Sequence, residues 1–239
     1  MSGFPGGTAV SIVTVYDWPT ADGQAGGSPH LHTASTEGYV VTRGTGAVET
    51  LSADGFERRE LARGTVLWFT PGTVHRLVNG SGDLEVTVVM QNAGLPEAGD
   101  AVLTYPAETL ADPEAYAAVT GAPAAPGLNE DERASAARRR RDLAVEGYLE
   151  LRDRVEAEGV KAMEPLWTAA ASLVSGRVAA WRPLWEHGPK SQVDATGRHL
   201  DALAEADGAH LCDAHVSDAG GTARRWGMCG RLETWDLRP

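Results

Sequence analysis

Residues 27–44 carry the strongest signal in this 239-residue chain, and they read Gly27-Ser-Pro-His-Leu-His-Thr-Ala-Ser-Thr-Glu-Gly-Tyr-Val-Val-Thr-Arg-Gly44. Successive side chains of a β-strand point to opposite faces, so His30 and His32 would lie on the same side of one strand. Glu37 follows a turn-like Thr-Ala-Ser-Thr, and a hairpin there would bring its carboxylate back beside the two imidazoles. Two imidazoles on one side of a strand are already half of a metal site.

A second stretch supplies another histidine. Residues 64–79 read Gly64-Thr-Val-Leu-Trp-Phe-Thr-Pro-Gly-Thr-Val-His-Arg-Leu-Val-Asn79, so that His75 comes shortly after a Pro-Gly turn. Trp68 and Phe69 alternate along this stretch. One of the two should therefore face the interior and the other the outside, and the pattern does not say which.

These two stretches resemble the two motifs of the cupin superfamily. The first matches His-x-His-x4-Glu-x6-Gly without a gap, and the second ends in Pro-Gly-x2-His-x3-Asn. Two departures are visible: Gln24 stands where the first motif has its leading glycine, and six residues rather than five separate Gly64 from Pro71. Both departures fall in turns and leave the four ligand positions intact.

The resemblance implies a small jellyroll barrel (a double-stranded β-helix) over about residues 10–110. It also implies a metal site formed by His30, His32, Glu37 and His75, although a barrel that has lost its metal is the alternative. We expect one divalent transition-metal ion as the cofactor. Nitrogen and oxygen ligands of this kind suit Fe, Mn, Ni, Zn or Cu and do not choose among them. An octahedral ion would keep about two positions open for water, substrate or dioxygen.

Strand parity predicts the wall of the pocket. If Glu37 and His75 face inward, so do the residues two and four positions after each of them. Tyr39 is the predicted catalytic residue, because a phenol two residues from a ligand could donate a proton; the alternative is that it only fills the barrel. Val41, Leu77 and Asn79 are the predicted substrate-pocket residues, with satisfaction of turn backbone groups as the alternative for Asn79.

The chain changes character near residue 121. Before it, short runs rich in Val, Thr and aromatic residues alternate with Gly and predict strands at 9–16, 38–43, 47–51, 64–70, 75–79 and 84–91. We expect a mainly β fold class: a cupin-type barrel with the metal site over residues 1–120, a linker at 121–128, and a mainly helical region over 129–239. Asp54-Gly55 and Gly80–Asp83 would be tight connections between paired strands.

The helical region contains three predicted helices. The first begins with a capping box formed by Asn129 and Glu132. It carries an apolar stripe of Leu143, Gly147, Tyr148, Leu151 and Val155. The second carries Trp167, Trp181 and Trp185, which would pack the helix against its neighbours or, alternatively, cover the mouth of the barrel. The third begins near Ser191 with Val193, Leu200 and Leu203 turned inward. Residues 209–216 and 228–237 resemble short strands that could return to a sheet.

The charge of the chain restricts its partners. The formal net charge is −12, so DNA and anionic lipid are not expected partners, and the run Arg138–Arg141 is interpreted as a solvated helix face. No apolar run approaches the roughly 18–20 residues of a membrane helix, and the N-terminus lacks a secretory pattern. We therefore expect a cytoplasmic protein with no membrane partner.

The cysteines do not form a recognisable framework. Cys212 and Cys229 are expected to be free thiols, because a cytosolic compartment is reducing. His210, Cys212, His215 and Cys229 are ligand types in one neighbourhood, but their spacing matches no common zinc pattern.

Three classes of function remain. The first is a metal-dependent enzyme of dioxygenase type, an oxidoreductase that acts on a small organic molecule. The second is a metal-dependent isomerase, epimerase or lyase on a sugar or keto acid, in which the ion polarises a carbonyl. The third is a non-catalytic cupin that binds a small molecule. The resemblance also implies a homodimer, which would cover exposed edge strands.

Overall fold

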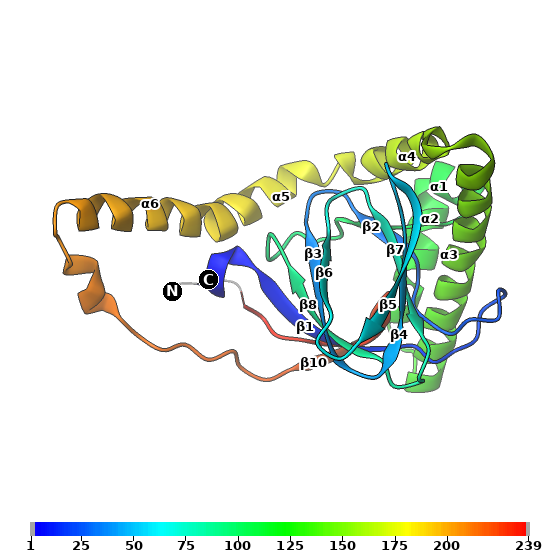
Figure 1. The fold of residues 1–239 in the computed structure, drawn as a ribbon, viewed down its shortest axis with the longest axis horizontal. Coiled ribbons are helices and arrows are strands. Elements are labelled where there is room, and N and C mark those ends of the chain that lie inside the picture. The colour runs from blue at the N-terminus through cyan, green and yellow to red at the C-terminus, as the bar shows by residue number, and fades with distance from the viewer. Residues whose placement is uncertain (1–2, 238–239) are drawn as a thin grey trace.

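The computed structural model describes residues 3–237 and contains two antiparallel β-sheets that face each other (Figure 1). One sheet has the strand order β10-β11-β1-β8-β3-β6, and the other has the order β5-β4-β7-β2-β9. The strands are β1 (Ala9–Val15), β2 (His30–His32), β3 (Glu37–Arg43), β4 (Thr45–Ser52), β5 (Gly55–Ala62), β6 (Val66–Phe69), β7 (Val74–Asn79), β8 (Glu85–Met90), β9 (Ala101–Leu103), β10 (Ala223–Trp226) and β11 (Gly230–Thr234).

The two sheets form an open jellyroll sandwich. This corrects the barrel that the sequence led us to expect. The edge strands of the two sheets do not pair with each other, because the chain bends where it passes from one sheet to the other. Gly44 is such a corner between β3 and β4: its φ of 72° is a conformation that glycine adopts without strain. Residues 80–83 likewise join β7 to β8 of the opposite sheet, and so do not connect paired strands. Asp54-Gly55 does connect a pair, β4 and β5.

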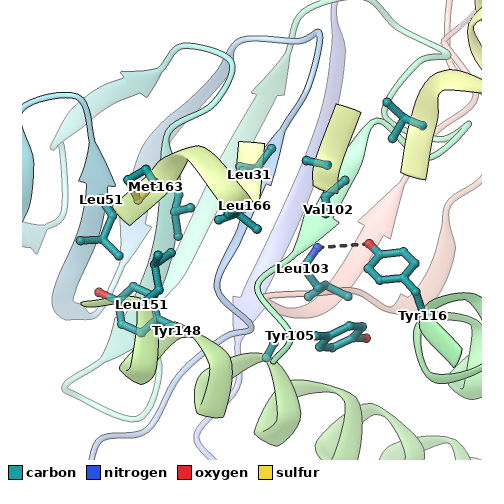
Figure 2. Packing of buried hydrophobic residues seen from close by; sticks show 14 of the residues in the cluster. Leu31, Leu51, Val102, Leu103, Tyr105, Tyr116, Tyr148, Leu151, Met163 and Leu166 are labelled. Atoms are coloured by element: carbon teal, nitrogen blue, oxygen red, sulfur yellow. Dashed lines mark hydrogen bonds between the residues drawn. The ribbon is translucent and has the colours of Figure 1, made fainter. Parts of the chain in front are cut away.

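The two faces of the five-stranded sheet are both covered. Between the sheets, an apolar cluster includes Val13, Tyr39 and Val41 from one side and Val48 and Leu77 from the other. On the outer face, the second cluster packs the sheet against the helices (Figure 2). Every residue of β7 is therefore buried, on both faces.

Helices follow the strands and begin earlier than the sequence suggested. They are α1 (Ala107–Ala111), α2 (Pro113–Gly121), α3 (Glu130–Glu158), α4 (Glu164–Ser175), α5 (Val178–Trp185) and α6 (Ser191–Ala204), with short 3-10 or π turns at Pro5–Gly7, Ala122–Ala124, Val160–Met163, Glu186–Lys190 and Ala209–Asp213. Two helices precede the predicted linker at 121–128, and part of that linker is itself a 3-10 turn. The mainly β description therefore holds only up to about residue 105.

The longest helix, α3, lies along the outer face of the five-stranded sheet. Its predicted capping box is present, with Asn129 accepting from the backbone of Glu132 and the Glu132 carboxylate accepting from the backbone of Asn129. Tyr148 and Leu151 of the predicted apolar stripe are buried. Gly147 allows the close approach, because a Cβ there would meet the carbonyl oxygen of Thr104 at 2.4 Å.

The arginine run on α3 divides between surface and interior. Arg138 and Arg139 are exposed as predicted, but Arg140 and Arg141 are buried, which corrects the interpretation of the whole run as a solvated face. Arg141 donates to the carbonyl oxygens of Trp18, at 2.7 Å, and of Gly26, at 3.0 Å. Four consecutive helical residues point in different directions, so the run has both an outer and an inner side.

The predicted tryptophan helix is two helices. Trp167 lies on α4 and donates to the carbonyl oxygen of Gly72 at 2.9 Å, and Trp181 on α5 donates to that of Ala98 at 3.3 Å. Trp185 is 38% exposed. The first two rings therefore pack the helices against loops of the sandwich.

Helix α6 departs most from expectation. Val193, Leu200 and Leu203, predicted to face inward, are 67%, 63% and 51% exposed. The helix follows the π turn at Glu186–Lys190 and extends beyond the sandwich (Figure 1). Near its start, Gln192 accepts a hydrogen bond from the backbone of Gly7 at 3.0 Å.

The C-terminal part returns to the sandwich. The predicted strand at 209–216 is wrong, since that segment contains a 3-10 turn. The strand predicted within 228–237 is present as β11, which pairs antiparallel with β1. Across residues 3–237, no helix combines the length and the apolar character that a membrane span requires.

Candidate metal centre

Four ligand-type side chains meet between the two sheets. His30 and His32 lie on β2, His75 on the neighbouring strand β7 directly opposite His30, and Glu37 at the start of β3 in the facing sheet. All four are buried, and one ligand atom from each lies within 4.8 Å of all the others. This is the group that the resemblance assigned, and we refer to it as the His cluster. It is compatible with a bound metal ion.

Hydrogen bonds orient the three imidazole rings. The Nδ1 atom of His30 lies 2.9 Å from the carbonyl oxygen of Ser28, and that of His75 lies 3.1 Å from the carbonyl oxygen of Thr73. His32 Nδ1 lies 2.6 Å from Oδ1 of Asp100. Each of these oxygens is an acceptor, so each Nδ1 carries a hydrogen, and in the neutral ring each Nε2 keeps a lone pair for a ligand.

The free ring nitrogens converge on one carboxylate. Glu37 Oε2 lies 3.2 Å from Nε2 of His32 and 2.8 Å from Nε2 of His75. Neither Glu37 Oε2 nor His75 Nε2 has a hydrogen-bond partner among the described residues. Two buried acceptor atoms at this distance repel each other unless a proton or a cation lies between them. The unpartnered nitrogen and oxygen atoms of the His cluster therefore fit a divalent metal ion.

The electrostatics of the His cluster are strongly coupled. Burial alone would raise the pKa of Glu37, but the neighbouring His75 and His32 hold it well below its usual value. Burial would lower the pKa of His32, but its hydrogen bonds to Asp100 and Glu37 raise it to about 10. Burial and the neighbouring His75 lower the pKa of His30. The protein environment thus keeps a charged carboxylate in a buried place.

A cavity of about 730 Å³ opens beside the His cluster. His30, His32 and Glu37 line it, together with residues of β1 and of the C-terminal segment 221–237. A cavity of this size is within the range of small-molecule binding sites. Its wall thus combines residues from the beginning, the middle and the end of the chain.

Tyr39 lies in the wall of this cavity. Its hydroxyl is buried and has no hydrogen-bond partner among the described residues, and its ring packs edge-on against Phe69 at 5.2 Å. Burial and the charge of Glu37 raise the pKa of Tyr39 well above its usual value, so the phenol stays protonated. Phe69 is the inward member of the Trp68–Phe69 pair, since Trp68 is 70% exposed.

The other predicted pocket residues lie elsewhere. Val41 and Leu77 are buried in the apolar cluster between the sheets and do not line the cavity. Asn79 donates to the carbonyl oxygen of Val15 at 3.0 Å and accepts from the backbone of Gly82 and Leu84. The Asn79 amide therefore satisfies backbone groups of the turn, which was the alternative prediction for this residue.

Three residues of the site were not assigned from the sequence. Asp100 is fully buried against His32 but stands in a loop far from both motifs. Arg140 lines the cavity from α3. Cys229 Sγ lies 4.0 Å from Nδ1 of His30, in a turn that only the tertiary fold brings near. The sequence signal for Cys229 was only that cysteine is a residue type that can bind a metal.

The remaining histidines and cysteine form no second cluster with Cys229. Cys212 and His215 are exposed, and the ring of His210 stacks on that of His199 at 4.3 Å. Both cysteines are free thiols in the structure. The fold separates them because the 3-10 turn at Ala209–Asp213 lies outside the sandwich (Figure 1), whereas Cys229 is buried in the apolar cluster between the sheets.

Comparison with solved structures returns several proteins that match part of this chain. The first is an uncharacterized protein with a double-stranded β-helix domain from Klebsiella pneumoniae, with 16% identity, a TM-score of 0.29, and coverage of 35% of this chain and 66% of that one. A second is WlaRA, a TDP-fucose-3,4-ketoisomerase from Campylobacter jejuni, with 16% identity, a TM-score of 0.29, and coverage of 34% and 58%. A third is the Streptomyces protein PAC13 with uridine, with 18% identity, a TM-score of 0.27, and coverage of 35% and 58%.

These alignments span at most about two thirds of the compared chains, and no curated protein sequence matches this chain. A family model described as "Cupin domain" matches residues 20–90. The match contains both motifs and all four residues of the His cluster. Residues 20–90 are therefore a cupin domain.

Proposed function

We propose that this protein is a metal-dependent enzyme of dioxygenase type that oxidises a small organic molecule. The observation that carries the proposal is the His cluster, in which buried ligand atoms without hydrogen-bond partners face one another at the wall of a 730 Å³ cavity. A purely structural cluster would be expected to satisfy its buried polar atoms internally.

His30, His32, Glu37 and His75 would hold the ion. A bound divalent ion would supply Lewis acidity and, if it is redox-active, activation of dioxygen. Ser28, Asp100 and Thr73 hold the three rings in one tautomer, so the site is organised before a ligand enters. Burial of the four side chains excludes bulk water from their immediate surroundings, which protects a reactive species from hydrolysis.

Tyr39 is the residue of this chain best placed to handle a proton. Its protonated hydroxyl lines the cavity and has no partner among the described residues. A buried donor of this kind also favours a second candidate, a metal-dependent isomerase or lyase, in which the phenol would protonate an enolate-like oxygen. The two candidates differ in their need for dioxygen.

Elemental analysis of the purified protein, followed by oxygen-uptake screening with Fe(II), Mn(II), Ni(II), Cu(II) and Zn(II), tests the proposal. We expect close to one ion per chain, and oxygen uptake with a redox-active ion and a panel of small organic substrates. Turnover of the same panel without oxygen and with Zn(II) would select the isomerase instead.

Variants of the His cluster provide the control. His75→Ala should lose at least ~90% of the bound metal, because it removes one of four ligands. His187→Ala, at an exposed position, should keep the wild-type metal content. Full metal occupancy in His75→Ala would show that the ligands are misassigned.

A further inference from the structure

Asp100 is a fully buried carboxylate that lies directly beside the His cluster. Its Oδ1 atom lies 2.6 Å from Nδ1 of His32. The residue precedes β9, whose Ala101 pairs with His32 across the antiparallel strands β2 and β9. The carbonyl oxygen of Asp100 also accepts from the backbone nitrogen and from the hydroxyl of Thr33, each at 2.9 Å. The sheet therefore fixes Asp100 next to one particular imidazole.

The charge of Asp100 has a single basic neighbour. Between residues 3 and 237, His32 is the only basic side chain that lies within 4 Å of the Asp100 carboxylate. Arg177 reaches the preceding residue, but it donates to the carbonyl oxygen of Gly99, at 3.1 Å. Oδ2 of Asp100 is buried and has no hydrogen-bond partner in the same part of the chain. A buried carboxylate is costly unless a cation balances it, so the balance for Asp100 has to come through His32.

The other two imidazoles of the His cluster have uncharged partners. Nδ1 of His30 faces the carbonyl oxygen of Ser28, and Nδ1 of His75 faces that of Thr73. These neutral acceptors fix the ring and its tautomer as a carboxylate does. Orientation of an imidazole therefore does not require a charged partner, and the charge of Asp100 needs a reason of its own.

The buried charges around His32 supply that reason. Three neutral imidazoles and the Glu37 carboxylate would leave a divalent ion with one positive charge uncompensated, among four ligands that are all buried. An uncompensated charge in such a place is unfavourable. The Asp100 carboxylate adds one negative charge on the Nδ1 side of His32, and the ion, Glu37 and Asp100 together then carry no net charge. The ligands and their buried neighbour therefore match an ion of charge two.

We propose that Asp100 is a positioning residue of the metal centre, which acts through His32 and supplies the second negative charge that balances a bound divalent ion. The proposal deepens the proposed function by assigning a residue that sets the affinity for the ion, and it rests on that function for the presence of the ion. A carboxylate bonded to the Nδ1 hydrogen also makes the imidazole a stronger ligand through Nε2. Asp100 thus acts on the ion without contacting it.

Titration of the chelator-treated protein with Co(II), in competition with a chromophoric chelator, tests this assignment. Asp100→Asn keeps the size of the side chain and an acceptor oxygen for Nδ1 of His32, and it removes the charge. We expect the Kd for Co(II) to rise about 10–100-fold, which is the usual effect of losing such a partner of a ligating histidine. A rise of less than about 10-fold would overturn the assignment.

Glu49→Gln provides the matched control. Glu49 on β4 is also buried, but its carboxylate pairs with Arg58 at 2.8 Å and accepts from Tyr148 of α3 at 3.2 Å. The Kd of the folded Glu49→Gln variant for Co(II) should stay within about 3-fold of the wild-type value, because this charge is balanced by its own partner. An equal rise of the Kd in Glu49→Gln and in Asp100→Asn would contradict a specific role of Asp100.

The absorption spectrum of the Co(II)-loaded protein separates charge from geometry. All four ligands remain in Asp100→Asn, so its bands should match those of the wild type at saturating Co(II). Shifted bands would show that Asp100 shapes the ligand geometry, and they would overturn the role of its charge. If Asp100→Asn does not fold, as judged by circular dichroism, Asp100→Glu decides, because it keeps the charge: a Kd for Co(II) within about 10-fold of the wild-type value supports the assignment, and a larger rise overturns it.

Failure of this inference and failure of the proposed function give different results. A wild-type protein that binds one Co(II) ion per chain, with the same Kd in Asp100→Asn, would reject only the role of Asp100. The expected rise of the Kd, in a protein that turns over no substrate, would reject only the enzyme. A wild-type protein that binds no ion would reject both.

Discussion

Two buried polar clusters lie on opposite faces of one strand, and they are built differently. His75 and Arg76 are consecutive residues of β7. His75 points between the sheets into the His cluster, whereas Arg76 points toward α3 into a group that we call the Arg76 cluster. That group consists of Asp22, Glu49, Arg58, Arg76 and Tyr148.

The difference lies in how each cluster satisfies its charges. In the Arg76 cluster, Arg76 pairs with Asp22 at 2.7 Å, and Glu49 accepts from Arg58 at 2.8 Å and from Tyr148 at 3.2 Å. In the His cluster, the lone pairs of Glu37 and His75 face each other without a donor. The charges of the Arg76 cluster pair with one another and link α3 to the sheet. The unpaired ligand atoms of the His cluster are instead suited to binding a ligand. The comparison teaches that burial alone does not identify a functional site.

The largest effect is expected from Arg76→Met. The variant removes the buried cation that pairs with Asp22 and lies near the buried Glu49, so the free energy of unfolding should fall by about 3–5 kcal/mol. Urea denaturation followed by circular dichroism measures this change.

The metal content of the folded Arg76→Met variant should equal that of the wild type, because Arg76 does not face the His cluster. Arg59→Met, in an exposed ion pair with Glu57, serves as control with a change below about 0.5 kcal/mol. Loss of metal in Arg76→Met would show that the two clusters are coupled.

Metal addition should affect the His cluster alone. An ion at 100 times its Kd stabilises the folded state by about 2.7 kcal/mol, which raises the melting temperature measured by calorimetry. The same shift should appear in Tyr148→Phe, whose change lies in the Arg76 cluster, and should be absent in His75→Ala. Equal melting temperatures of chelator-treated and metal-loaded wild type would contradict the metal assignment.

The Arg76 cluster should make the protein sensitive to acid. Burial alone would raise the pKa of Asp22, but hydrogen bonds from Arg76 and Thr20 hold it below its usual value. A lowered pKa in the folded state contributes stability above the pKa of the unfolded chain, near 4, and this stability is lost as the pH falls further. The melting temperature of Asp22→Asn should therefore fall less between pH 6 and pH 3 than that of the wild type. An identical decrease in both proteins would exclude Asp22 as a source of the acid sensitivity.

Much of the His cluster could be predicted, because its information is local. The two-residue spacing of His30 and His32 fixes a common face, and the strand parity after Glu37 correctly turned Tyr39 inward. Three strands were missed: β5, β9 and β10. β5 carries a charged stretch on a sheet edge, β9 has only three residues, and β10 has only four.

The remaining errors concern contacts between distant segments. Asp100 and Cys229 come from segments that only the tertiary fold brings to the His cluster, so no spacing could reveal them. The run of arginines at 138–141 was predicted to be a solvated helix face. Arg141 is instead bonded to carbonyl oxygens more than a hundred residues away in the sequence. Helix α6 shows the reverse: its apolar residues suggested burial, but Val193, Leu200 and Leu203 are more than half exposed.

The smallest effects come from a pair of Tyr→Phe variants that compare the two clusters atom by atom. Tyr148 donates to Glu49 at 3.2 Å, so Tyr148→Phe should cost about 1 kcal/mol of unfolding free energy. The hydroxyl of Tyr39 has no partner among the described residues, so Tyr39→Phe in the metal-free protein should change stability by less than about 0.5 kcal/mol. Urea denaturation of both variants under the same conditions gives the difference. A larger loss in Tyr39→Phe would mean that the hydroxyl near the His cluster is held by the protein, and that cluster would then be structural in the same sense as its counterpart on the other face of β7.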